Sequence, residues 1–395
     1  MLSVNASAEA WSLDGKGFAY ATTEGIWTIK VPLFDHPHLI AREPASNGII
    51  WSPDGRELAF IGAHSGERGD TIWLVREDGS GLKDLLPAGG SSSQPGPQRR
   101  SLALESWLPN NGIAFSMGVG TGFIEHLLVD PDSGSIRELC TSRGPIFWSP
   151  QNSTAVVQND ESAGATPAGL GLLRISDALQ SPDHDRECST LIESFILPGR
   201  QLIASFNAWS PDGSEVMFTR NSDVGGTSMP DLYLWDIGRG SIREIMENAS
   251  DGKWSPDEKF LAAVVHGKPY YSLDGALRSG SRPYAGSKLF IVGWPKSTVS
   301  GSLKISRDVL GFNWSNRCHC LAITEPTNVV LVKFANKAWQ TESILKPFRT
   351  TFGSELPWSV EWSPDGEWLM LSSGWLQGVL SPTIYILRMP RDRSQ

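Results

Sequence analysis

The stretch Trp51-Ser52-Pro53-Asp54-Gly55, WSPDG, recurs unchanged from Trp209 and again from Trp362. Looser copies extend the series to eight, and their tryptophans are Trp11, Trp51, Trp107, Trp148, Trp209, Trp254, Trp314 and Trp362. Neighbouring copies are roughly 40 to 60 residues apart, a spacing typical of the four-stranded blades of a β-propeller. The chain is therefore predicted to be a repeat protein.

The letters of the motif predict a tight turn. Proline presets φ for the first central position, aspartate suits the next, and glycine accepts the left-handed conformation that closes a short hairpin. In the copy at Trp51 a β-forming run, ELAFIG, follows the turn, and the runs TIWLVRE and GLKDLLP come later. With the apolar residues before the motif, these runs predict four strands per copy.

Eight copies of four strands predict an all-β fold, an eight-bladed β-propeller of four-stranded antiparallel blades, formed by residues 1–395 as a single domain. In such a fold each motif tryptophan is expected to lie as a wedge between neighbouring blades. The last copy lacks a fourth strand, because only RDRSQ follows Pro390. We predict that Leu2–Ala6 pairs with the Thr383–Met389 strand, so that an N-terminal strand completes the last blade.

The W-S-P-D-G turn, the "aF" strand after it and the later "IW" strand resemble the TolB-like, or PD40 (WD40-like), β-propeller repeats. The resemblance covers essentially the whole chain. It implies the propeller fold. It implies no single activity, because that family includes protein-binding modules, the propeller parts of prolyl-oligopeptidase-type peptidases and a few lyases.

Composition narrows the classes of partner. The chain is 40% hydrophobic and 19% charged, with a formal net charge of −9 and a pI near 5.4. An acidic chain argues against general binding to nucleic acid or to an anionic membrane. The chain has no apolar run of 18 residues, so no membrane insertion is predicted. The N-terminus lacks the layout of a signal peptide. The expected location is the cytoplasm, or the periplasm or exterior if a signal peptide has been removed.

Four cysteines in 395 residues do not predict a disulfide framework. Cys318 and Cys320 flank His319 in the expected second strand of the seventh unit, where alternation would place the sulfurs and the imidazole on opposite faces. We therefore expect packing there and no metal site. The histidines are scattered, and only His64 and His266 fall at the ends of second strands. The chain carries no common catalytic or nucleotide-binding motif, and no cofactor is expected.

Long connections are expected at the end of each blade opposite the W-S-P-D-G turn, where binding sites tend to be built. The longest, in the sixth unit, concentrates tyrosine and arginine, residues typical of binding hot spots. The alternative is a flexible insertion whose rings pack back on the propeller. The candidate binding residues, with one tryptophan from the eighth unit, are Tyr270, Tyr271, Arg278, Arg282, Tyr284 and Trp375.

A second set of candidates precedes the motif tryptophans on the expected innermost strands, where the side chains would line a channel. These residues are Glu9, Glu105, Asn207, Asp251, Asn313 and Glu361. Converging carboxylates can bind a cation or cleave a sugar, although a solvated channel lining explains the same pattern more simply.

These observations favour a non-enzymatic scaffold that binds a protein or peptide partner through the long-loop face. The alternative is a propeller enzyme, a glycoside hydrolase or polysaccharide lyase, with its site at the channel mouth.

Overall fold

The structure is a computed structural model, and all structural statements refer to the residues it describes. These are residues 2–31, 36–43, 45–63, 70–86, 101–119, 122–159, 169–180, 188, 193–194, 203–221, 230–266, 288–294, 303–305, 309, 311–325, 328–335, 338–345, 357–373 and 383–389. The chain divides into two compact units, one of residues 4–159 and 171–194 and the other of residues 1–3, 160–170 and 195–395.

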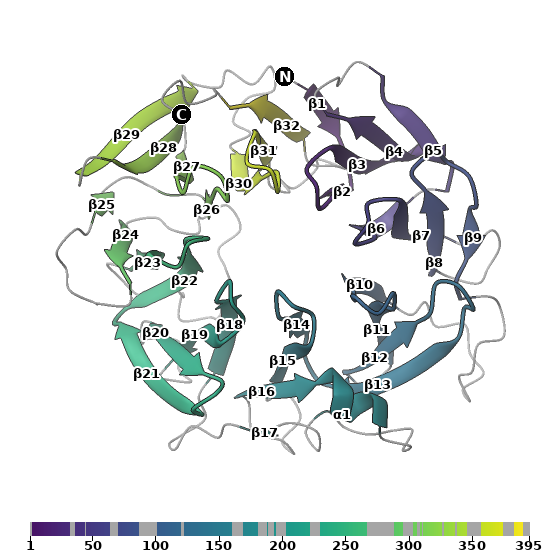
Figure 1. The fold of residues 1–395 in the computed structure, drawn as a ribbon, viewed down its shortest axis with the longest axis horizontal. Helices are drawn as coiled ribbons and strands as arrows, with labels where there is room; N and C mark the ends of the chain where they lie inside the picture. The colour runs from purple at the N-terminus through teal and green to yellow at the C-terminus, as the bar shows by residue number, and fades with distance from the viewer. Residues whose placement is uncertain are drawn as a thin grey trace. The chain divides into compact units, whose positions relative to one another are not determined.

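The first unit contains four antiparallel four-stranded sheets, here called blades one to four (Figure 1). Blade one consists of β2 (Ala8–Trp11), β3 (Gly17–Thr22), β4 (Gly25–Lys30) and β5 (His38–Ala41), and blade two of β6 (Ala45–Trp51), β7 (Glu57–Ala63), β8 (Asp70–Arg76) and β9 (Lys83–Asp84). Blade three consists of β10 (Leu102–Trp107), β11 (Ile113–Val119), β12 (Phe123–Val129) and β13 (Ile136–Ser142). Blade four consists of β14 (Ile146–Trp148), β15 (Thr154–Asn159), β16 (Gly169–Arg174) and β17 (Glu193–Ser194), and the short helix α1 (Ile175–Gln180) follows β16.

The second unit contains blades five to eight. Blade five consists of β18 (Ile203–Trp209), β19 (Glu215–Asn221), β20 (Asp231–Asp236) and β21 (Ser241–Met246), and blade six of β22 (Ala249–Trp254), β23 (Phe260–Val265), β24 (Lys288–Gly293) and β25 (Leu303–Ile305). Blade seven consists of β26 (Gly311–Trp314), β27 (Leu321–Glu325), β28 (Asn328–Ala335) and β29 (Ala338–Leu345). Blade eight consists of β30 (Pro357–Trp362), β31 (Trp368–Ser373) and β32 (Thr383–Arg388), together with β1 (Leu2–Asn5).

Eight such sheets confirm the predicted fold class, an eight-bladed β-propeller. The strand order of the last blade is β1-β32-β31-β30. The N-terminal strand therefore completes the last blade, as predicted from the missing fourth strand. Among the described residues, α1 is the only α-helix, and no helix there has the length and apolar character needed to cross a membrane.

The motif forms the predicted hairpin turn, and its serine and aspartate hold it together. In blade two the Ser52 hydroxyl donates to Asp54 Oδ1 at 2.7 Å, while the amide of Gly55 donates to the Ser52 carbonyl at 2.9 Å. Gly55 has φ of 70°, which favours glycine. Hydrogen bonds from Ser52 and from the amide of Arg56 lower the pKa of Asp54.

Seven of the motif tryptophans are buried and Trp148 is half-buried. Three repeat one contact: the indole N–H donates to the carbonyl of the residue just before the motif tryptophan of the preceding blade. The distance is 3.1 Å from Trp51 to Ala10, from Trp314 to Lys253 and from Trp362 to Asn313. The wedge therefore joins blades by a directional bond as well as by packing.

The cysteines correct two expectations. Cys140 and Cys188 form a disulfide with Cα atoms 5.0 Å apart, and both are fully buried. Sequence spacing does not reveal this pairing, because β13 and the segment after α1 approach each other only in the fold. Cys318 and Cys320 lie in the turn before β27, which begins at Leu321, and the structure pairs them as a disulfide. The expected strand alternation was wrong for these residues, because a turn does not alternate its side chains as a strand does.

Candidate functional site

The six loop candidates lie outside the described residues. Tyr270, Tyr271, Arg278, Arg282 and Tyr284 belong to the connection between β23 and β24, and Trp375 belongs to the connection between β31 and β32. The structure therefore leaves their proposed role as a prediction.

The six residues expected to line a channel divide between the two units. Glu9 on β2 and Glu105 on β10 belong to the first unit, and the other four belong to the second. In the second unit Asn207, Asp251 and Glu361 contribute to one polar cluster around β22, as described below. Asn313 instead serves the backbone, because its side-chain oxygen accepts from the amide of Trp314 at 3.0 Å.

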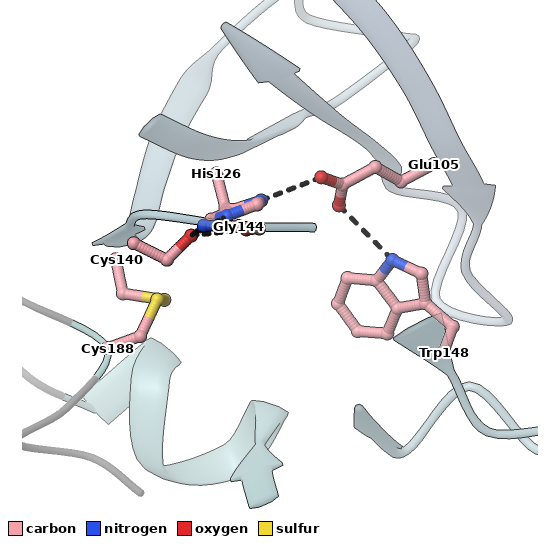
Figure 2. The surroundings of a disulfide bond; sticks show 7 residues. Glu105, His126, Cys140, Gly144, Trp148 and Cys188 are labelled. Atoms are coloured by element: carbon pink, nitrogen blue, oxygen red, sulfur yellow. Dashed lines mark hydrogen bonds and ion pairs between the residues drawn. A yellow bond between two sulfur atoms is a disulfide. The ribbon is translucent and has the colours of Figure 1, made fainter. Parts of the chain in front are cut away.

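Glu105 lies in a buried hydrogen-bond network of blades three and four (Figure 2). Its Oε1 lies 2.7 Å from Nδ1 of His126, and its Oε2 accepts from the indole of Trp148 at 3.2 Å. His126 Nε2 lies 2.7 Å from the hydroxyl of Ser142, which donates to the carbonyl of Gly144 at 2.6 Å.

This order of serine, histidine and carboxylate is that of a hydrolase triad. However, Ser142 is 5% exposed and its hydroxyl hydrogen is already used by a backbone carbonyl. We therefore assign the network to the packing of blade three, next to the Cys140–Cys188 disulfide (Figure 2).

The polar cluster in the second unit is built on an irregular innermost strand. The pairing of β22 with β23 shifts register between Ser250 and Lys253, and Asp251, inside this bulge, has φ of 53°. A Cβ atom at Gly252 would overlap the side chains of Met217 and Leu232. The Gly252 amide donates to Asn207 Oδ1 of blade five at 3.1 Å. The bulge is thus held in place and re-aims the side chains on both sides of Gly252.

Asp251 is the end of a short relay. The Ser250 hydroxyl donates to Asp251 Oδ2 at 2.7 Å, and His266 Nε2 lies 2.7 Å from the same hydroxyl. A hydroxyl has one hydrogen, so His266 must donate from Nε2. Burial lowers the pKa of His266, and the charge of Asp251 opposes that effect. The neutral imidazole that burial favours can carry its hydrogen on Nε2, consistent with this relay.

Lys253 occupies the position directly before the motif tryptophan. Its Nζ donates to the carbonyl of Phe312 in blade seven at 2.9 Å and lies 5.4 Å from the centre of the Phe312 ring. Burial lowers the pKa of Lys253, while the charges of Asp251 and Glu361 raise it. Among the described side chains no carboxylate is within ion-pair distance of this ammonium group. Lys253 therefore has further N–H groups that no described acceptor uses.

Glu361 occupies the same position on β30 of blade eight. Burial raises the pKa of Glu361, and the Lys253 charge lowers it. Glu361 is nevertheless an exposed residue, so water screens this effect. Asp251, Lys253 and Glu361 together form a group with two carboxyls and one amine, coupled through charge without direct pairing.

Sequence reasoning selected Asp251 and Glu361 but missed Lys253 and Ser250. The sequence does contain a signal for Lys253, because it stands directly before a motif tryptophan, as Asn313 and Glu361 do. In other blades the same position holds an apolar residue: Ala10, Ile50 and Ala208. A lysine at this position has to reach into the interface with the next blade.

The arrangement offers hydrogen-bond donors, an acceptor and three groups with displaced pKa values, His266, Lys253 and Glu361. Such groups gather at binding and catalytic sites. Among the described residues no cluster of three or more histidine, cysteine, aspartate or glutamate side chains is arranged to hold a metal ion. The chemistry available here is hydrogen bonding, charge recognition and proton transfer.

Comparison with known proteins identifies the fold. No protein-family model matches the chain, and no curated protein matches it. An oligogalacturonate lyase in complex with manganese is 11% identical with a TM-score of 0.56, over 98% of this chain and 90% of the lyase. The C-terminal WD40 domain of Sif2 is 11% identical with a TM-score of 0.56, over 99% of this chain and 97% of that domain. A TolB protein from Agrobacterium tumefaciens is 14% identical over 75% of this chain and 91% of its own, with a TM-score of 0.39.

At these identities the likeness to the lyase and to the WD40 domain establishes the fold alone. The WD40-like propeller fold that the motif predicted is confirmed at that level. A shared activity does not follow from it.

Proposed function

We propose that this propeller is a scaffold that binds a protein or peptide partner, with the inner strand of blade six at the centre of the binding site. The observation that carries the proposal is Lys253, a half-buried lysine held by one carbonyl and one ring, with no carboxylate of the described residues in contact. Burial of an ammonium group is unfavourable unless its donors are satisfied. A bound partner would satisfy them.

The chemistry of Lys253 and Glu361 favours a peptide as the bound partner. An amide group presents a carbonyl that accepts from Lys253 and an N–H that donates to Glu361, two groups that are coupled but not in contact. A sugar site would also need an aromatic platform. The rings beside Lys253, those of Phe312, Trp254 and Trp314, are buried between blades and unavailable for stacking.

The position of the polar relay in the chain also supports a binding site for a peptide. In blade six the second strand ends at Val265, and the connection to β24 starts with His266, the last residue of the polar relay. This connection, residues 266–287, is the one that contains the tyrosine and arginine candidates. A partner held by that connection would lie next to the relay.

The test is capture of partners from a lysate of the source organism, followed by titration of each identified partner against purified protein. Four baits are compared: the wild type, Lys253→Met, a chain with a shortened 267–287 connection, and Lys259→Met as the matched control. Lys259 is an exposed lysine of the same blade, paired with Asp257 at 3.1 Å. We expect the first two changes to weaken binding and the control to leave it intact. Equal binding by all four baits would refute the proposed site.

One observation favours a second candidate, an enzyme acting on an acidic oligosaccharide. A lysine with a lowered pKa and a glutamate with a raised pKa can serve as base and acid in the same reaction. Incubation with a panel of acidic oligosaccharides, with product detection by mass spectrometry, distinguishes the two functions. Turnover that is lost in both Lys253→Met and Glu361→Gln would favour the enzyme.

A further inference from the structure

The turn of blade seven departs from the five turns in which an aspartate pairs with the motif serine. In five blades the motif serine donates to an aspartate two residues later; these pairs are Ser12–Asp14, Ser52–Asp54, Ser210–Asp212, Ser255–Asp257 and Ser363–Asp365. In blade seven the residue two after Ser315 is Arg317, and Cys318 replaces the glycine. The turn of blade seven has lost both its carboxylate cap and its glycine.

A disulfide closes the turn instead. Cys318 and Cys320 are bonded across His319, with Cα atoms 5.1 Å apart. His319 has φ of 47°, the left-handed conformation that glycine provides in four of the other turns and a non-glycine residue in the remaining three. The bond therefore constrains a short loop in a conformation that its residues do not favour.

The two sulfurs differ in access. Cys320 is fully buried against Leu369 and Leu371, whereas Cys318 is half-buried on the turn. Arg317 and His319 on either side of Cys318 are both exposed. Arg317 donates to Glu367 at 2.6 Å, and His319 Nδ1 lies 3.9 Å from Asp257. An attacking thiolate is an anion, and basic side chains next to Cys318 favour its approach.

We propose that Cys318–Cys320 is a redox-active disulfide that exchanges with small thiols of the glutathione class. The thiolate of the small molecule attacks Sγ of Cys318, the Cys318–Cys320 bond breaks, and Cys320 leaves with the electron pair and takes a proton. A second thiolate then attacks the sulfur of the small molecule in the mixed disulfide. Cys318 is released as a thiol, and the small molecule leaves as its own disulfide, so two thiols are oxidised and one protein disulfide is reduced.

The Cys140–Cys188 disulfide is an internal control in the same chain. Both of its sulfurs are fully buried in the core of blades three and four, and it joins residues 48 positions apart. No small thiol reaches that bond unless the blade opens. The two disulfides are therefore expected to respond differently to the same reagent.

The experiment uses the folded full chain in buffers of reduced and oxidised glutathione. Free thiols are alkylated after a short exposure and located by peptide mass spectrometry. We expect full labelling of Cys318 and Cys320 in the reducing buffers and no labelling of Cys140 and Cys188. Labelling of both pairs together, or of neither before the protein unfolds, would overturn the proposal.

The direction of attack has its own test. In Cys320→Ser a glutathione adduct is expected on Cys318, and in Cys318→Ser no adduct is expected on Cys320. An adduct on Cys320 alone would contradict the assignment. If a variant fails to fold, the wild-type chain gives the answer through amide exchange, because reduction removes the covalent closure and leaves the turn capped only by the Ser315 hydroxyl, which accepts from the amides of Arg317 and Cys318. We expect faster exchange at residues 316–320 after reduction, and unchanged exchange there would also overturn the proposal.

Discussion

The wedge tryptophans allow the inter-blade hydrogen bond to be separated from packing. Trp314 and Trp254 are 5% and 7% exposed, and each has a large aromatic neighbour, Phe260 for the first and Trp294 for the second. Trp314 Nε1 donates to the Lys253 carbonyl at 3.1 Å, whereas Trp254 Nε1 is buried and has no hydrogen-bond partner in the part of the chain that the structure describes. Replacement of each by phenylalanine removes similar apolar area and one N–H.

The expected difference comes from that N–H. In Trp314→Phe a hydrogen bond with a net value of about 0.5–1.5 kcal/mol is lost. In Trp254→Phe an unpaired buried donor is removed, which offsets part of the packing loss, since such a donor costs about 1–3 kcal/mol. Because the two effects add, Trp314→Phe is expected to be the less stable variant by about 1.5–4.5 kcal/mol. Full truncation of a wedge, as in Trp51→Ala or Trp209→Ala, is expected to cost about 3–5 kcal/mol.

The assay is urea unfolding followed by far-ultraviolet circular dichroism, because the substitutions change the tryptophan fluorescence itself. Midpoints are compared only if the slopes of the transitions agree, since blades can unfold separately. Equal losses in the two phenylalanine variants, or a larger loss in Trp254→Phe, would refute the view that the indole N–H joins neighbouring blades.

Three further predictions follow from the fold and the cluster. Deletion of residues 1–7 should speed amide exchange in Thr383–Arg388, because β1 pairs with that strand; unchanged exchange in a deuterium-exchange experiment would contradict the pairing. Cys140→Ser should lower the free energy of unfolding by about 4 kcal/mol for a loop of this length, measured by urea midpoint, and the same loss is expected when a strong reductant cleaves the bond to Cys188. Burial lowers the pKa of Lys253 in the folded chain. Between that lowered pKa and the ordinary pKa of lysine, the unfolded chain binds more protons than the folded chain, so the free energy of unfolding rises with pH. Lys253→Met should lack this rise when unfolding is measured from neutral pH to about pH 10, and an identical pH dependence in both proteins would argue against the burial of Lys253.

The regular parts of the fold were predictable because the motif encodes them locally. A turn such as Ser52–Gly55 depends on residues within one hairpin, and the wedge position of Trp51 follows from its place in the repeat. The last blade was predictable from a count of strands. In each case the physical cause lies within a few residues of the motif or in the number of its copies.

The irregular parts were not predictable, because they depend on residues distant in sequence. Lys253 finds its carbonyl at Phe312, and Cys140 finds its partner at Cys188. Neither pairing follows from spacing, since strand order alone does not give the approach of side chains. The position of Cys318 was misjudged for a different reason: the turn of blade seven lacks the aspartate and glycine that mark the turns of blades one, two, five and eight.

Blade six departs from the repeat more than its neighbours in the second unit do. Its innermost strand contains the bulge at Asp251 and Gly252, a glycine that no other residue can replace without overlap, and a lysine directly before the motif tryptophan. Its connection at residues 266–287 is also the longest between second and third strands. A repeat tolerates such departures only where they are compensated, and part of the compensation for the half-buried Lys253 ammonium group, beyond the Phe312 carbonyl and ring, is missing among the described residues. The partner that we propose would supply it, which is why binding should respond to Lys253→Met more strongly than stability does at neutral pH.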